Sequence, residues 1–217
     1  MFFRFLFKPK DFETTLDGTI RLRRLGPGDA GIFRDHIHAL HFTDFRDRFN
    51  GLASDHWLDR YIVRSLLDAT CIGAFSGDDL VAVAELHSGS HLAAGEAESA
   101  FSVASDWRRK GLGKLLVKAL LKAATEAGIS TIIIETGPQN HAMKALARRF
   151  GAKMRFGGDQ SVGRINVAEG LRIAGRRKPP PPLAVAAAGL GGGSGGEHGG
   201  GLADGLGDRP AVPQTAV

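Results

Sequence analysis

The sequence predicts one α/β domain of the α+β kind, in which strands and helices are interspersed along the chain. Three observations carry this prediction. The chain has 217 residues, of which 43% are hydrophobic, enough for one packed core. Apolar residues recur at helical spacing in several segments and form strand-like runs in others. Near the C-terminus both patterns stop, and a proline- and glycine-rich composition takes over.

The composition excludes several classes of protein. No run of about 18 apolar residues occurs, which excludes a membrane-spanning helix. Cys71 is the single cysteine, which excludes a disulfide framework and a multi-cysteine metal site. A reducing, cytoplasmic location is therefore expected. The formal net charge of +5 is too small to indicate nucleic-acid binding.

The first half of the chain is expected to contain two helices and three strands. Residues 19–23 alternate and predict a strand, after which Pro27 begins a helix that runs to about Leu40. Ser54 caps a second helix. Two apolar runs, 71–75 and 80–86, flank a turn and predict a β-hairpin.

The second half is expected to contain four strands and two helices. The predicted strands are 97–104, 131–135, 153–156 and 161–167. A strong helix begins at Leu112 and ends at Gly128. A second helix covers about 140–150.

The two ends of the chain differ from this pattern. Residues 1–16 form an apolar and basic segment, which we expect to pack on the domain, with a weak membrane-surface contact as the alternative. Arg4 interrupts its apolar stretch, which argues against a signal peptide. The folded domain is expected to cover 17–174. The tail, 175–217, has eleven glycines between Gly189 and Gly207 and is expected to be disordered.

The most informative motif lies between the strand 97–104 and the helix that follows. Arg108, Gly111 and Gly113 form R-x-x-G-x-G in this turn. Glycines at a helix start allow close approach of a ligand, and the free N–H groups there favour an anion, phosphate above all. The alternative is a tight turn with solvated cations.

This motif, in this order of elements, resembles the GNAT (Gcn5-related N-acetyltransferase) superfamily over residues 19–167. The resemblance implies a central mixed, mostly antiparallel sheet of six to seven strands with about four flanking helices. It also implies acetyl-CoA as co-substrate and no metal. In such a site the turn binds the pyrophosphate, and backbone groups of the preceding strand bind the pantetheine arm. The matching residues are Arg108, Arg109, Lys110, Gly111, Leu112, Gly113 and Lys114 for the pyrophosphate, and Phe101, Ser102 and Val103 for the arm.

Two further motifs resemble the branch that contains bacterial protein-lysine acetyltransferases. The first is N-x-x-M-x-x-L-A-x-x-x-G, which starts at Asn140, and the second is A-E-x-A-x-x-V at 97–103. By this resemblance Asn140 contacts the CoA arm, Glu98 is the general base, and a protein lysine is the acceptor. Many members carry a tyrosine at the position of Ala147, where it protonates the leaving thiolate. Tyr61, the single tyrosine here, lies on an early helix instead.

Proton-transfer chemistry and strand geometry also support Glu98 as the base. An amine must lose a proton to attack a thioester, and a nearby carboxylate can take it. Strand alternation puts Glu98 on one face with small side chains, which leaves room for a ligand, while Phe101 and Val103 face the core. The backbone N–H of Val103 is a candidate donor to the oxyanion. Glu98 as a structural ion pair is the alternative, and Glu85 and Glu96 are rival carboxylates.

The histidines and the cysteine are expected to be structural. His36 and His38 point about 200° apart on a helix, so the group His36, His38 and His41 predicts solvated or capping side chains rather than a metal site. Cys71 is expected to be a small core residue. His141 is expected to face solvent at a helix start.

The expected function is transfer of acetyl from acetyl-CoA to a primary amine by direct attack. A small amine is the alternative acceptor. A non-catalytic CoA-binding module, and an interaction or membrane-tethered protein, are the alternatives from other classes.

Overall fold

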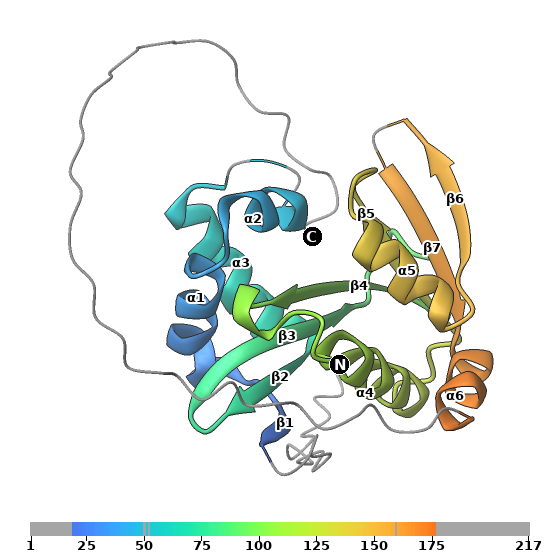
Figure 1. Cartoon of the computed structure of the whole chain (residues 1–217), viewed down its shortest axis with the longest axis horizontal. Helices are drawn as coiled ribbons and strands as arrows, with labels where there is room; N and C mark the ends of the chain where they lie inside the picture. Colours follow the sequence, from blue (N-terminus) through green and yellow to red (C-terminus); the bar gives the residue numbers. More distant parts are fainter. Residues whose placement is uncertain (1–18, 50, 52, 159, 177–217) are drawn as a thin grey trace.

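The computed structural model of the chain describes residues 19–49, 51, 53–158 and 160–176 (Figure 1). The predicted N-terminal segment 1–16, and all but the first two residues of the predicted tail 175–217, lie outside these residues.

Seven strands form one sheet in the order β1-β2-β3-β4-β5-β7-β6. All neighbouring strands are antiparallel except β4 and β5, which are parallel. This is the mixed, mostly antiparallel sheet that the resemblance to the GNAT superfamily implies. The strands are β1 (Ile20–Arg24), β2 (Thr70–Ser76), β3 (Asp79–His87), β4 (Glu96–Val103), β5 (Thr131–Thr136), β6 (Lys153–Gly157) and β7 (Gln160–Asn166).

The described residues contain six α-helices. They are α1 (Ala30–His38), α2 (Phe42–Phe49), α3 (Asp55–Asp68), α4 (Leu112–Glu126), α5 (His141–Arg149) and α6 (Val167–Gly175). A 3₁₀ turn over Pro27–Asp29 precedes α1. Four of the helices match predicted ones. Ser54 caps α3 by accepting a hydrogen bond from the backbone N–H of Trp57, as its sequence position predicts.

The sequence interpretation missed α2 and α6. Asn166 is the N-cap of α6: its side chain accepts a hydrogen bond from the N–H of Glu169, 3.0 Å away. An asparagine at this position can indicate a helix start. The sequence interpretation instead placed every residue up to Val167 in the preceding strand.

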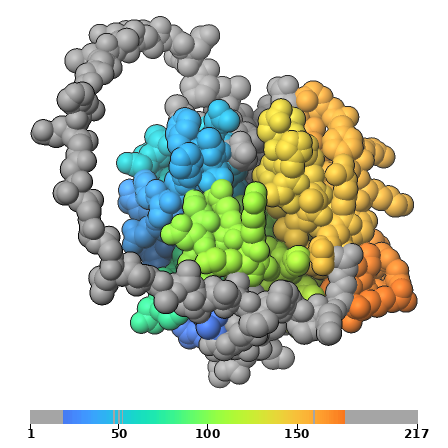
Figure 2. Space-filling model, viewed as in Figure 1, coloured from blue at the N-terminus to red at the C-terminus, as the bar shows by residue number. Residues whose placement is uncertain are grey.

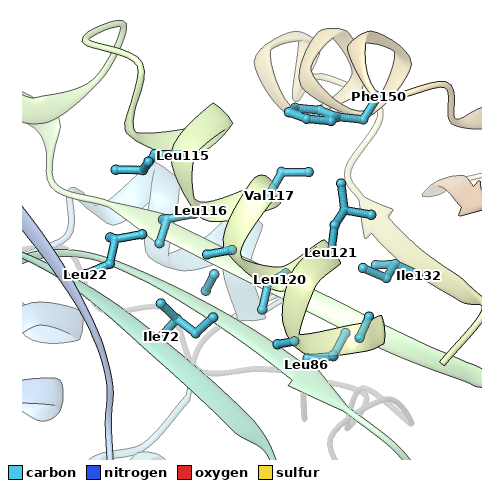
Figure 3. Packing of buried hydrophobic residues seen from close by; sticks show 14 of the residues in the cluster. Leu22, Ile72, Leu86, Leu115, Leu116, Val117, Leu120, Leu121, Ile132 and Phe150 are labelled. Carbon is cyan, nitrogen blue, oxygen red and sulfur yellow. The ribbon is translucent and has the colours of Figure 1, made fainter. Parts of the chain in front are cut away.

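Helices cover both faces of the sheet. On one face α4 packs its leucines onto Leu22, Ile72 and Leu86 of the strands (Figure 3). Nine of the 15 residues of α4 are buried, so packing on the sheet holds this helix in place. On the other face α1 and α3 enclose a second cluster that includes Phe33 and Ile62.

The pairing of β4 with β5 ends before either strand does. Their four register pairs run from Glu96↔Thr131 to Ser99↔Ile134. Beyond this point β4 continues to Val103 and β5 to Thr136 with no pairing between them. The sheet therefore presents an open backbone edge at its centre. Among the described helices, none combines the length and apolarity that crossing a membrane requires.

Candidate active site

A cavity of about 1300 Å³ lies at the open edge between β4 and β5. Its walls come from α2 and α3 on one side and from α5 on the other, with the turn before α4 between them. Figure 2 shows these bounding elements, with the N-terminal helices in blue, α4 and its turn in green and α5 in yellow.

The glycine turn opens onto this cavity. Gly111 has φ +95° and stands immediately before α4, a left-handed conformation that favours glycine. The first N–H groups of α4 have no partners within the helix, and they carry the positive end of its dipole. The chemistry of this helix start, beside the unpaired edge of β4, fits a phosphate on an extended arm.

Most of the predicted turn residues line the cavity. They are Arg108, Arg109, Gly111, Leu112, Gly113 and Lys114. Lys110 is absent from the cavity wall, and its Nζ lies 5.0 Å from the centre of the Trp107 ring. The guanidinium of Arg108 forms an ion pair with Asp44 of α2, and its Nε donates to the Val103 carbonyl oxygen, 3.3 Å away. Arg108 therefore links the turn to α2.

The predicted residues of β4 also line the cavity. Phe101 and Val103 pack their side chains against the core under α4, as alternation predicts. The side chain of Ser102 is buried and lies 2.9 Å from Nε2 of His36. The other ring nitrogen, Nδ1, lies 3.0 Å from the Leu80 carbonyl oxygen. Because that oxygen only accepts, Nδ1 carries the proton, and Nε2 accepts the hydrogen bond from the Ser102 hydroxyl.

The expectation that His36 is solvated or a cap is wrong. Its side chain is 5% exposed and lies on the sheet-facing side of α1, near Phe33 and Ile37. Burial lowers the pKa of His36 to about 4. His38 and His41 are exposed, as expected. Among the residues that the structure describes, no group of three or more His, Cys, Asp or Glu is arranged to hold a metal ion.

His36 should make stability depend on pH. The unfolded chain takes up a proton at a pKa of about 6.5, whereas the folded chain resists it down to about 4. The free energy of unfolding should therefore fall as the pH drops from about 6.5 to about 4. Urea unfolding across this range measures it, and His36→Gln should flatten this part of the curve. An unchanged slope in the variant would show that other groups cause the dependence.

Glu98 lines the cavity with its side chain 18% exposed. It lies opposite His87 on the neighbouring strand, and its Oε1 is 3.8 Å from Nε2 of His91. Within the described part of the chain, no Lys or Arg nitrogen lies within 4.0 Å of its carboxylate. Glu98 therefore faces the space that a ligand would occupy and is not held in an ion pair with a lysine or arginine.

The rival carboxylates have other partners. Glu96 forms an ion pair with Arg164 of β7 and is absent from the cavity wall. Glu85 is 1% exposed and accepts hydrogen bonds from Nη2 of Arg48 at 2.5 Å and from the Tyr61 hydroxyl at 2.7 Å. Nε2 of His87 lies 3.1 Å from the same carboxylate. Of the three candidates, Glu98 alone lines the cavity.

This buried cluster also accounts for Tyr61. Its hydroxyl donates to Glu85 and accepts from Arg48, and burial raises the pKa of Tyr61. Burial alone would raise the pKa of Glu85 as well, but the charge of Arg48 and the contact with His87 outweigh it and lower that pKa to about 2. The Tyr61 hydroxyl therefore already donates its hydrogen bond to the ionised carboxylate of Glu85.

The remaining predictions meet mixed outcomes. Cys71 is buried and donates to the Ser65 carbonyl oxygen, which confirms its core role. His141 is exposed, as predicted. Asn140 lines the cavity, but its Oδ1 caps α5 by accepting from the N–H of Met143, 2.9 Å away.

Sequence reasoning missed Glu135. This residue is near the end of β5 and lines the cavity. Burial, and then the negative charge of Glu98, raise its pKa. A carboxylate directly after the buried run Ile132, Ile133 and Ile134 was the available signal.

The chain matches the model of the Acetyltransferase (GNAT) family over residues 34–152. Among solved structures it is similar to the GNAT domain of S. lividans PAT, with 21% identity and a TM-score of 0.63 over 73% of this chain and 96% of that one. The ribosomal-protein-S5-alanine acetyltransferase of Vibrio fischeri is 11% identical, with a TM-score of 0.60 over 72% and 96%. The PaiA N-acetyltransferase of Thermoplasma acidophilum, in complex with coenzyme A, is 20% identical, with a TM-score of 0.53 over 68% and 98%.

Proposed function

The chain belongs to the GNAT acetyltransferase family and is an acetyl-CoA-dependent N-acetyltransferase, and from this premise we propose that it acetylates protein lysines with Glu98 as the general base. The observation that carries the proposal is the position of Glu98, a carboxylate without a lysine or arginine partner on the wall of the cavity that the glycine turn adjoins.

In this proposal acetyl-CoA binds along the open edge of β4. The pyrophosphate lies on the N–H groups at the start of α4, with Arg109 and Lys114 nearby, and Gly111 allows its close approach. Arg108 either leaves Asp44 to join the phosphates or holds α2 against the turn. The pantetheine arm pairs with backbone groups of Phe101, Ser102 and Val103, as a strand would.

The acceptor enters from the side of α2 and α3. An ε-ammonium group has a pKa of about 10.4 and must lose a proton before it can attack. Glu98 takes that proton, directly or through a water molecule, and the neutral amine attacks the thioester carbon. The backbone N–H of Val103 is our candidate donor to the oxygen that becomes negative. No covalent acetyl-enzyme is required.

The preference for protein lysine rests on the motifs that begin at Ala97 and Asn140. A small amine is the alternative acceptor. A panel containing a lysine-rich protein, peptides with a free N-terminal alanine and small amines, incubated with acetyl-CoA and read by mass spectrometry, separates them. Acetyl-lysine as the main product supports the proposal, and a product confined to N-termini or small amines overturns the acceptor class.

Gly111 provides a test of the cofactor position. Gly111→Ala should weaken acetyl-CoA binding at least tenfold, because a Cβ at φ +95° forces the turn to change shape. Gly128→Ala is the matched control, since Gly128 also has positive φ but lies at the other end of α4, outside the cavity wall. Isothermal titration should show normal binding in the control. Equal weakening in both variants would mean that strain in α4, rather than the turn, affects binding.

A further inference from the structure

Two carboxylates flank the point where β4 and β5 separate. Glu98 is paired in register with Ile133, and the last pair is Ser99↔Ile134. Side chains two residues apart on a strand share a face, so Glu135 lies on the face that carries Ile133 and Glu98. Both carboxylates line the cavity. The register places them on the same face of neighbouring strands, at the point where the pairing of β4 with β5 ends.

This point is where the reacting atoms would arrive. The turn before α4 adjoins the far end of β4, beyond Val103. An arm that starts at the turn and follows β4 from Val103 toward Ala100 brings its thioester to the place where the two strands join. The thioester would then have Glu98 on the strand to one side and Glu135 on the strand to the other.

Acetyl transfer needs a proton donor as well as a base. The amine nitrogen bonds to the acetyl carbon, the carbon–sulfur bond breaks, and its electron pair stays on sulfur as a thiolate. From ammonium to amide the nitrogen loses two protons: the first passes through Glu98 to solvent before the attack, and the second goes to Glu98 once the carbon–nitrogen bond has formed. The sulfur requires one proton. Ala147 has no proton to give, and the hydroxyl of Tyr61 already donates to Glu85.

We propose that Glu135 is the general acid that protonates the departing thiolate of CoA. This inference rests on the proposed function. Each turnover leaves Glu98 protonated and Glu135 ionised, so one proton moved from Glu98 to Glu135, directly or through water, restores the starting state and the balance.

The environments of the two carboxyl groups agree with these roles. Burial and the charge of Glu98 favour the protonated form of Glu135. Within the described part of the chain, Glu98 has no lysine or arginine nitrogen within 4.0 Å of its carboxylate, and Nε2 of His91 lies 3.8 Å from it. A carboxyl pair in which one member holds its proton more tightly is a recurring arrangement of acid and base.

The test is the turnover of Glu135→Gln, which keeps the shape of the side chain but holds no acidic proton. We expect kcat to fall at least tenfold, with KM for acetyl-CoA and for the acceptor within about threefold of wild type. Glu96→Gln, a carboxylate on β4 outside the cavity, should keep kcat near wild type.

A pH series separates an acid from a structural role. The ratio of wild-type to Glu135→Gln kcat should fall as pH rises, because only the wild-type side chain loses the proton. A wild-type kcat in the variant, or a constant ratio with a raised acceptor KM, overturns the proposal.

Two further outcomes are also decisive. If thermal unfolding shows that Glu135→Gln does not fold, Glu135→Asp takes its place. A reduced kcat that still falls with rising pH supports Glu135 as the acid. A full kcat in Glu135→Asp overturns the proposal. If the wild-type protein acetylates no amine, the proposed function fails; if it does so and the Glu135 variants match it, this inference alone fails.

Discussion

Glu98→Gln is expected to lower the rate of acetyl transfer at least tenfold while acetyl-CoA affinity stays close to normal. A general base contributes about 10² to 10⁴-fold to such a step. The amide keeps the shape of the carboxylate but cannot accept the proton of the ammonium group. Since Glu98 lies on the cavity wall away from the glycine turn, the binding of the pyrophosphate should be unaffected. Thiol release measures the rate, and calorimetry measures the affinity.

Glu98→Asp is the informative companion. It keeps the carboxylate and moves it back by one methylene, so it should retain more activity than Glu98→Gln. Unchanged turnover in Glu98→Gln would remove this residue from the mechanism.

Arg48→Met is expected to destabilise the protein by about 3–5 kcal/mol, the usual cost of breaking a buried ion pair by removing one partner. Glu85 is 1% exposed and is held by Arg48, Tyr61 and His87, so the variant leaves a buried carboxylate without its full cation. Urea unfolding at neutral pH measures the loss. The Glu85 pair also adds acid sensitivity: its stabilisation is present above the unfolded pKa of about 4.3 and is lost as pH falls toward about 2.

The double variant Arg48→Met with Glu85→Leu tests the cause. Removing both charges should restore part of the stability lost in the single variant, because no uncompensated charge is left. A double variant that is less stable than Arg48→Met would show that packing, rather than the unpaired charge, dominates.

Local signals predicted the elements that build the centre of the site. Short segments of the sequence are enough to predict the apolar stripe of α4, the glycines before it and the strand that carries Glu98. All seven described strands and four helices follow from period and capping in the same way. The short helix α2 was missed although Phe42, Phe45 and Phe49 recur at helical spacing, because eight residues offer only three such positions.

Contacts between residues that lie far apart in the sequence could not be predicted from local sequence patterns. His36 could be judged only against its own helix, whereas its partners, Leu80 and Ser102, come from two strands. The buried cluster around Glu85 needs α2, α3 and β3 together. The role proposed for Glu135 depends on the parallel register of β5 with β4, which a carboxylate beside an apolar run does not by itself reveal.

Direct attack by an amine beside Glu98 is best tested in a single turnover, with enzyme in excess over isotope-labelled acetyl-CoA and a lysine-containing acceptor protein present. Intact-mass spectrometry of both proteins at successive times follows the label. We predict that it appears on acceptor lysine as free CoA is released, with no acetyl-enzyme at any time, and that Glu98→Gln slows both together. A label that passes through the enzyme, or CoA released without an acetylated amine, would contradict the account.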